Sequence, residues 1–263
     1  MLSFMRNPSL IKILILVFCL LAYFPISAQV LRVAVAANAQ MLIKKLQADF
    51  NKKTGIKLEV IVGASGKLTT QIMNGAPYDV FLSADTEFPD QLFAKGFGLQ
   101  RPKIYALGSL IICGNTKNDM QNWKNIISDP KTGKIAIANP KTAPYGKAAE
   151  EALKYFHLKE KVISKLVYGE SISQVNTYIQ TGAVSLGFTT ESFLYENVDQ
   201  SRLKWARIDP KSYQAIKQGA ILLTYAKKGQ LNEATRFYTY LSSALAQQII
   251  RKSGYHLPAI QKK

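Results

Sequence analysis

The chain is poor in the residues on which metal sites and disulfide-stapled folds depend. Its 263 residues include two cysteines and two histidines, His157 and His256. Cys19 lies in an N-terminal apolar run, so Cys113 has no partner for an intrachain disulfide once that run is removed. The apolar residues before Cys113 indicate a buried, small apolar side chain. No cysteine pair has the spacing of a metal site, and we expect no bound metal cation.

Sequence motifs of common catalytic sites are also absent. The chain has no G-x-S-x-G elbow, no P-loop and no H-E-x-x-H. Asp79 and Asp85 are the only carboxylates within a motif-like stretch. Acids near strand ends more often cap helices or pair with lysines than catalyse. We therefore expect a protein that is not an enzyme, and an exported hydrolase that uses these two acids is kept as an alternative.

Acidic residues are half as frequent as basic ones, 17 against 34, which gives a formal net charge of +17. A basic balance suggests anionic partners such as nucleic acid, membrane surfaces or small anions. The lysines are scattered singly or in pairs without a basic block, and an exported chain does not meet nucleic acid. We expect no nucleic-acid partner, and a modest general attraction for small anions.

No apolar run is long enough to cross a membrane. The longest, Ile13 to Phe24, falls short of the roughly 20 residues that a bilayer requires. Arg6 and Lys12 provide positive charge at its start, and the small residues Ser27 and Ala28 follow it. This pattern predicts a Sec signal peptide over residues 1–28. The mature chain would then be a soluble periplasmic protein, which we expect to be a monomer.

The mature sequence alternates strand and helix patterns. Val30 to Ala36 is an apolar, β-branched run typical of a buried strand, and Leu42, Leu46 and Phe50 then recur at helical spacing. Further strands are expected at residues 58–62 and 79–82, with a short helix between them. Alternation with short loops predicts an α/β fold in which each sheet is mainly parallel and flanked by helices.

A second α/β unit follows the first. Tyr105 to Cys113 reads as one long strand, and Ala220 to Tyr225 as another. We expect the chain to cross between two lobes near residues 107–110 and again near 219–222. The predicted division is residues 29–107 and 223–263 for lobe 1 and 108–222 for lobe 2, with a ligand cleft between them.

Four strand-to-helix junctions place small or polar residues where a helix begins. They are residues 36–39, with Asn38 as the expected N-cap, and residues 63–66, 139–146 and 169–172. A helix N-terminus has unpaired N–H groups and about half a positive charge, so it binds anions without needing a lysine or arginine. Because junctions at the carboxyl ends of strands meet at one edge of an open sheet, they are candidates for a shared anion site.

Several stretches resemble one family. N-G-A-P-Y-D-V-F-L-S-A-D at residues 74–85 closely resembles a signature of periplasmic molybdate-binding proteins, which serve ABC importers. The resemblance extends, in order, over most of the mature chain. The further segments are V-A-V-A-A-N-A at 33–39, G-A-S-G-K-L-T-T-Q-I at 63–72, A-N-P-K-T-A-P-Y-G at 138–146, L-G-F at 186–188 and G-Y-H-L-P at 254–258.

The resemblance implies a two-lobed fold that holds molybdate or tungstate in the cleft and delivers it to an inner-membrane ABC permease, with no cofactor. It implies anion contacts from Asn38 and Ser65, through side chain and backbone, and from Tyr145 and Ile172 through backbone N–H. Thr190 stands where many members use a tyrosine hydroxyl and is a possible additional contact.

Two departures and one alternative accompany the resemblance. Ala37 stands where some members use a threonine, so that hydroxyl contact is lost. The segment from Asp79 to Asp85 is expected to support the site rather than contact a dianion, and Lys67 to be a solvated side chain. An exported binder for sulfate, phosphate or an organic acid remains the alternative within the same class.

Overall fold

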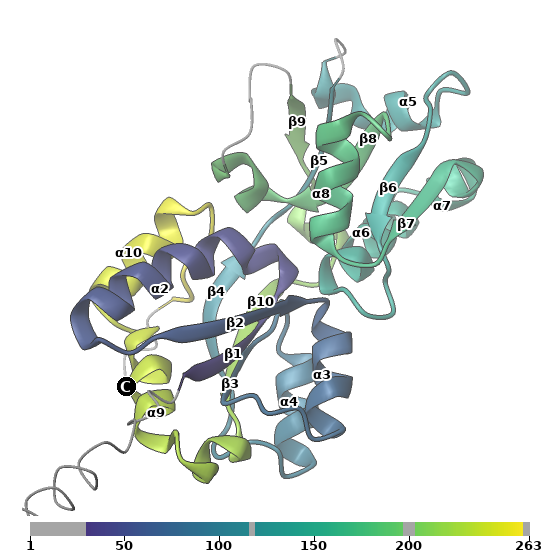
Figure 1. The fold of residues 1–263 in the computed structure, drawn as a ribbon. Coiled ribbons are helices and arrows are strands. Elements are labelled where there is room, and N and C mark those ends of the chain that lie inside the picture. Colours follow the sequence, from purple (N-terminus) through teal and green to yellow (C-terminus); the bar gives the residue numbers. More distant parts are fainter. Residues whose placement is uncertain (1–29, 116–118, 197–202, 260–263) are drawn as a thin grey trace, which may run out of the picture.

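The described part of the chain forms two five-stranded sheets, each flanked by helices (Figure 1). The computed structural model describes residues 30–115, 119–196 and 203–259. We call the sheet of strand order β2-β1-β3-β10-β4 with its helices lobe 1, and the sheet of order β7-β6-β8-β5-β9 with its helices lobe 2. The expected signal peptide at residues 1–28 lies outside the described residues. The fold is α/β and two-lobed, as the sequence predicts.

Lobe 1 contains both ends of the described chain. Its strands are β1 (Leu31–Ala36), β2 (Leu58–Gly63), β3 (Val80–Leu82), β4 (Lys103–Gly108) and β10 (Ile216–Leu222). Its helices are η2 (Ala37–Ala39), α2 (Gln40–Thr54), α3 (Ser65–Met73), α4 (Glu87–Ala94), η7 (Thr224–Lys228), α9 (Leu231–Tyr240) and α10 (Ala244–Lys252).

Lobe 2 is formed by the middle of the chain. Its strands are β5 (Leu110–Gly114), β6 (Ile135–Ala138), β7 (Leu166–Gly169), β8 (Leu186–Thr190) and β9 (Lys204–Arg207). Its helices are η3 (Met120–Asn122), α5 (Trp123–Ser128), α6 (Pro144–Tyr155), α7 (Lys159–Val162), η4 (Ile163–Lys165), α8 (Ile172–Thr181), η5 (Glu191–Tyr195) and η6 (Pro210–Ser212). None of the helices in the described ranges is long and apolar enough to span a membrane.

The apolar runs in the sequence are strands buried on both faces. In β1, Val33 and Val35 pack with residues of α2, α9 and α10, whereas Ala34 packs on the other side with residues of α3 and α4. Successive strand residues point to opposite faces, so a sheet covered by helices on both sides needs apolar residues at every position. This explains why residues 33–36 are all apolar, whereas Arg32 near the start of the strand is half-exposed and pairs with Glu59.

Each sheet is mainly parallel, as the sequence predicts, because a single strand runs against the direction shared by the other four. In lobe 1, β1 is parallel to β2 and β3, but β10 is antiparallel to both β3 and β4. In lobe 2, β6 is parallel to β7 and β8, but β5 is antiparallel to both β8 and β9. In each sheet, the antiparallel strand is one that enters directly from the other lobe.

The chain crosses between the lobes twice, and one crossing differs from the expected position. The expected single strand from Tyr105 to Cys113 is two strands in different sheets, with Ser109 between them, so the first crossing lies at Ser109. The second lies between β9 and β10. An expected boundary after residue 222 is too late, because β10 as a whole pairs with β3 and β4 of lobe 1.

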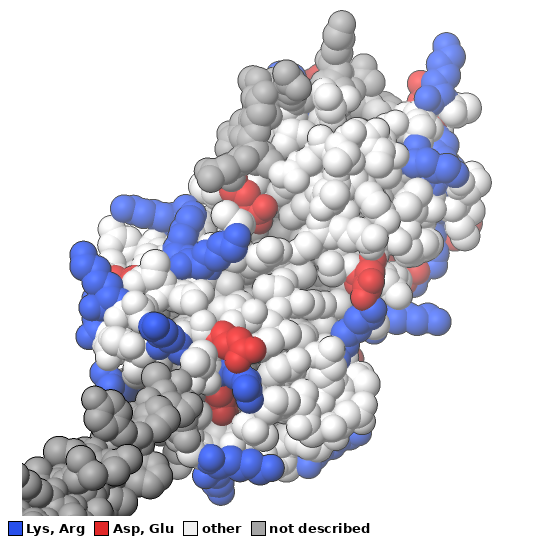
Figure 2. All heavy atoms as spheres, viewed as in Figure 1, with Lys and Arg blue, Asp and Glu red and all other residues white. Residues whose placement is uncertain are grey.

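Basic side chains do not gather in one place on the face of the molecule drawn in Figure 2. Lys and Arg residues on this face are spread over both lobes, with few acidic residues among them. A solvated, scattered distribution supports general solubility more than a specific polyanion site. The anion site is therefore sought between the lobes rather than on this surface.

Candidate anion-binding site

A small cavity lies between the two lobes and is lined from both of them. Its volume is about 10 Å³, close to the minimum for one water molecule. Entry of any larger ligand therefore requires the lobes to separate. The lining residues are Ala36, Ala37, Asn38, Ala64, Ser65 and Ala84 from lobe 1, with Ala143, Pro144, Tyr145 and Ile172 from lobe 2.

All four predicted junctions meet at this cavity. Ser65 and Ile172 are the first residues of α3 and α8, Tyr145 is the second of α6, and Asn38 lies in η2, which continues directly into α2. The helices α3 and α6 begin at Ser65 and Pro144, so the junction residues themselves form their first turns. Backbone N–H groups of a first turn have no partner within the helix.

No side chain caps these four helix starts. Neither η2, α3, α6 nor α8 shows a hydrogen bond from the side chain of its N-cap residue. At α10, by contrast, the hydroxyl of Ser243 accepts from the N–H of Ala246. Uncapped starts leave N–H groups available to an anion, and their dipoles favour negative charge at the cavity.

Ser65 is placed so that its hydroxyl proton is free for a ligand. The side chain is buried, and its Oγ accepts a hydrogen bond from the N–H of Ala84 at 3.1 Å. A hydroxyl that accepts from a backbone N–H still has its own proton to donate. Ser65 thus offers an O–H donor at the cavity in addition to its own backbone N–H, whereas the N–H of Gly66 in the same turn already donates to Thr142.

Asn38 is not the N-cap that the sequence predicts. Its Nδ2 donates to Oε1 of Gln218 at 2.8 Å and to the hydroxyl of Tyr255 at 3.1 Å, and no side-chain cap forms at η2. The amide nitrogen is therefore already bonded on the side away from a ligand. In this arrangement Asn38 can donate to an anion through its backbone N–H but not through its side-chain amide nitrogen.

Tyr145 reaches away from the cavity with its side chain. The ring is buried, and the hydroxyl accepts from Nε2 of Gln218 at 3.4 Å. Burial raises the pKa of this hydroxyl well above its usual range, an effect that a hydrogen bond with Thr190 partly opposes. The side chain is thus neutral and structural, and its backbone belongs to the cavity lining.

Thr190 lies outside the cavity lining. Its Oγ1 is 2.5 Å from Oγ of Ser192 and accepts from the N–H of Ser192 at 2.9 Å, which caps η5. The residue is buried at the end of β8. Thr190 therefore stabilises the start of η5 and the buried hydroxyl of Tyr145.

A neutral hydrogen-bonded network behind the cavity was not foreseen from the sequence. It joins Gln218, Tyr105 and Tyr255 to Asn38, with the Tyr255 hydroxyl donating to the carbonyl of Asn38 at 2.7 Å. Burial raises the pKa of Tyr255 to about 12 and that of Tyr105 well above its usual range, so both stay neutral. One signal was available, because Gln218 is an amide in a strand whose other residues, apart from the exposed Lys217, are apolar or glycine.

The two acids of the hydrolase alternative lie apart. Asp79 precedes β3 and accepts from the N–H of Arg32 at 2.8 Å, whereas Asp85 follows that strand and accepts from the Ser83 hydroxyl at 2.9 Å. The two acids thus flank β3, whose three residues lie between them along the strand. Neither acid lines the small cavity. They support the strand, as the sequence predicts.

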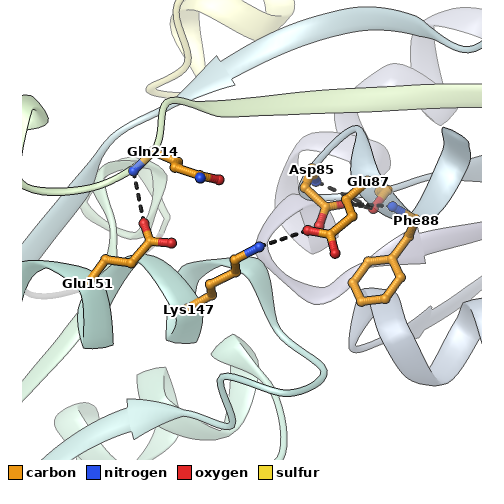
Figure 3. Close-up of polar contacts among 7 residues, drawn as sticks. Asp85, Glu87, Phe88, Lys147, Glu151 and Gln214 are labelled. Atoms are coloured by element: carbon orange, nitrogen blue, oxygen red, sulfur yellow. Dashed lines mark hydrogen bonds and ion pairs between the residues drawn. The ribbon is translucent and has the colours of Figure 1, made fainter. Parts of the chain in front are cut away.

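Charged pairs join the two lobes, and one of these pairs is drawn in Figure 3. Nζ of Lys147 in α6 lies 2.7 Å from Oε2 of Glu87 in α4, and Lys67 pairs with Glu170. Lys67 thus takes part in an ion pair between the lobes, whereas the sequence predicts a solvated side chain. The N–H of Gly66 also donates to the carbonyl of Thr142 at 2.9 Å. The lobes are therefore closed on one another.

A second cavity of about 90 Å³ adjoins this rim, between the same two lobes. Asp85, Glu87, Lys147 and Glu151 line it, and Glu151 accepts from the N–H of Gln214 at 2.9 Å (Figure 3). Burial raises the pKa of Asp85 to about 6. Within the described ranges, no group of three or more His, Cys, Asp or Glu side chains is arranged to hold a metal ion.

Two lobes joined by two crossings, with a cavity lined by helix starts from both, define the class of periplasmic solute-binding folds. The periplasmic molybdate-binding protein of Azotobacter vinelandii has this architecture, and its solved structure matches the chain with a TM-score of 0.81 at 29% identity. The match covers 87% of this chain and 99% of that one.

The chain belongs to the family of bacterial extracellular solute-binding proteins, whose sequence model matches residues 31–256. Among curated relatives, the molybdate-binding protein ModA of Azotobacter vinelandii is 35% identical over 228 residues, which cover 86% of this chain and 89% of the relative. ModA of Rhodobacter capsulatus is also 35% identical, over 88% of this chain and 90% of the relative.

Proposed function

We propose that this protein captures molybdate, and also tungstate, for an ABC importer. The observation that carries the proposal is the meeting of four uncapped helix starts from both lobes at one cavity. The identity of 35% to two proteins named for molybdate binding supports the choice of ion. The role is that of a binding protein rather than an enzyme.

The proposed anion contacts are the backbone N–H groups at Asn38, Ser65, Tyr145 and Ile172 together with the Ser65 hydroxyl. Each helix start stabilises a negative charge by roughly 0.3–1 kcal/mol when exposed and up to about 2 when partly buried. Four such starts offset a substantial part of the desolvation cost of a dianion. The donors are neutral, so specificity depends on their spacing rather than on a counter-charge. Thr190 is a further contact only if the Tyr145 region rearranges on binding.

Spacing favours one size of oxyanion. Molybdate and tungstate have nearly the same size and charge, so both fit one set of fixed donors. Sulfate has the same charge but is smaller, so fixed donors leave it incompletely contacted, and unmade hydrogen bonds at a buried site carry a large penalty. We therefore expect molybdate and tungstate to bind more tightly than sulfate or phosphate.

The proposal extends to location, partner and lobe boundaries. We place the mature chain in the periplasm, as a monomer exported through the signal peptide of residues 1–28, where its closed form docks on an inner-membrane permease. We assign residues 30–108 and 216–259 to lobe 1 and 109–215 to lobe 2, in line with the strand membership of the two sheets. Gel filtration and cell fractionation test the monomer and the location.

A thermal-shift screen of the mature chain tests the ligand. A ligand present at 100 times its Kd stabilises the folded state by about 2.7 kcal/mol, which is readily visible as a rise in Tm. We expect molybdate and tungstate at micromolar concentrations to raise Tm, and sulfate and phosphate at the same ionic strength to leave it nearly unchanged. A larger rise with sulfate or phosphate would assign the protein to a different oxyanion.

A further inference from the structure

Gln218 is an amide enclosed where the two lobes join. Its exposed fraction is 0%, and it lies in β10, two residues after the chain returns from lobe 2. The pairing of β10 with β4 shifts register between Gln218 and Gly219. Such a bulge re-aims a side chain at a chosen position of a strand. Burial of an amide is unfavourable unless its donor and acceptor are both used.

Both ends of this amide are used, and they serve different lobes. On the lobe 1 side, Oε1 accepts from Nδ2 of Asn38 at 2.8 Å and from the hydroxyl of Tyr105 at 3.0 Å. On the lobe 2 side, Nε2 donates to the hydroxyl of Tyr145 at 3.4 Å, which is at the long end of the hydrogen-bond range. An amide suits this position because it offers an acceptor oxygen at one end and a donor nitrogen at the other.

Two of these partners also line the anion cavity, one from each lobe. Asn38 lies in η2, and Tyr145 lies in the first turn of α6. Their side chains both bond to Gln218, and both residues line the cavity. A change in the position of this amide therefore shifts donors on both sides of the anion at once.

The Tyr145 hydroxyl packs closely against the backbone of Gly108. A Cβ added at Gly108, the last residue of β4 before the crossing, would lie 1.9 Å from the Tyr145 hydroxyl and 3.1 Å from Nε2 of Gln218. A glycine is required here because the tyrosine occupies the space of a side chain. The contact places the Tyr145 hydroxyl directly against the first crossing between the lobes.

We propose that Gln218 is a positioning residue that couples closure of the lobes to assembly of the anion site. When the lobes close, Tyr145 reaches Gln218, which at the same time holds Asn38. When they open, the Tyr145 contact is lost and the two halves of the site separate. The proposal rests on the proposed function, because it takes the cavity between the lobes as the anion site.

The test compares two variants that each remove one buried amide. Gln218→Met keeps the length of the side chain without its hydrogen bonds. Asn176→Leu is the matched control, since Asn176 is 7% exposed and bonds to Thr189 entirely within lobe 2. Both variants should lower Tm, so loss of stability alone does not distinguish a positioning role from a purely structural one.

Affinity and lobe closure supply the distinguishing readouts. Calorimetric titration with sodium molybdate should show Gln218→Met weaker than wild type by about tenfold, as expected for loss of a buried hydrogen bond in the closed form. Asn176→Leu should stay within about twofold on the same scale. Inter-lobe distance is measured by electron–electron resonance between spin labels at Lys52→Cys and Lys161→Cys, with and without molybdate. Burial raises the pKa of Cys113 to about 12, so that thiol does not compete for the label.

In the labelled Gln218→Met protein, distances should shift towards the open form at equal molybdate concentration, and also without added anion. Equal distance distributions in Gln218→Met and wild type under both conditions would overturn the inference. An equal loss of molybdate affinity in Gln218→Met and Asn176→Leu would also overturn the inference. A wild type that binds sulfate but not molybdate contradicts the proposed ligand only, and the comparison is then made with sulfate. If neither ion binds, the proposed function is wrong, and the distances without anion still decide the role of Gln218.

Discussion

At the scale of single residues, the structure divides side chains near the cavity into those that face it and those that hold it. Ser65 accepts from Ala84 and keeps its own proton free, whereas the amide of Asn38 is bonded to Gln218 and Tyr255. Residue type alone does not distinguish the two, because both serine and asparagine are common at helix starts. The difference lies in which neighbouring atom each side chain reaches.

Replacing Ser65 with alanine should weaken molybdate binding by about 1–3 kcal/mol, the range for a hydrogen bond to a charged group. Isothermal titration of the purified mature protein measures this. Ser243→Ala is the control, because the Ser243 hydroxyl also accepts from a backbone N–H but caps α10 in lobe 1, away from the cavity lining. Ser243→Ala should lose stability without losing affinity. Unchanged affinity in Ser65→Ala would remove Ser65 from the site.

At the scale of elements, helix starts are both the site and the surfaces on which the lobes meet. The start of α3 touches lobe 2 through Gly66, whose N–H donates to the carbonyl of Thr142. A Cβ at Gly66 would lie 3.0 Å from Cα of Thr142 and 3.0 Å from Cζ of Phe88. The first contact is with backbone, which gives less readily than the end of a side chain.

Gly66→Ala should therefore impede closure. Extra volume in a packed contact typically costs about 1–3 kcal/mol, which corresponds to roughly 5–150-fold in affinity. Gly63→Ala is the control in the same loop, because its Cβ would meet only the side chain of Leu68, at 3.3 Å, within lobe 1. Titration and melting of both variants check this. A Gly66→Ala protein that binds as tightly as Gly63→Ala would show that the α3 contact does not limit closure.

At the scale of the whole molecule, two crossings and a rim of contacts govern how the lobes meet. Exposed ion pairs contribute little individually, about 0–1 kcal/mol each. The side chains of Lys67 and Glu170 are 49% and 63% exposed, so their pair belongs to this group. The tight contacts of α3 and of Tyr145 should therefore matter more for closure than the charged rim.

Lys67→Ala should reduce molybdate affinity by less than about fivefold, and by less still at high salt, where exposed pairs are screened. A double-mutant cycle with Glu170→Ala isolates the contribution of the pair. Lys154→Ala is the control, since Lys154 pairs with Glu150 inside lobe 2. A loss much larger than fivefold that resists salt would mean that Lys67 attracts the anion directly.

Much of the architecture could be predicted from local pattern. The apolar run of β1, the helical spacing of α2 and the small residues at the junctions depend on neighbours in the chain, and they specify an α/β fold with helix starts suited to anions. The resemblance of residues 74–85 to one family added the ion. The placement of Asn38, Ser65, Tyr145 and Ile172 as ligand contacts remains a prediction, although all four line one cavity.

Other features depend on partners far away in the sequence. Asn38 is 180 residues from Gln218 and 217 from Tyr255, so no local pattern reveals that its amide is used behind the cavity rather than as a cap. The assignment of β10 to lobe 1 likewise rests on pairing with β3 and β4. By itself, the sequence determined which segments form strands and helices and which helix starts can bind an anion, because propensity and periodicity are local. Only the tertiary structure decided how the lobes close and which side chains hold the site, because long-range hydrogen bonds exist only after the chain has folded.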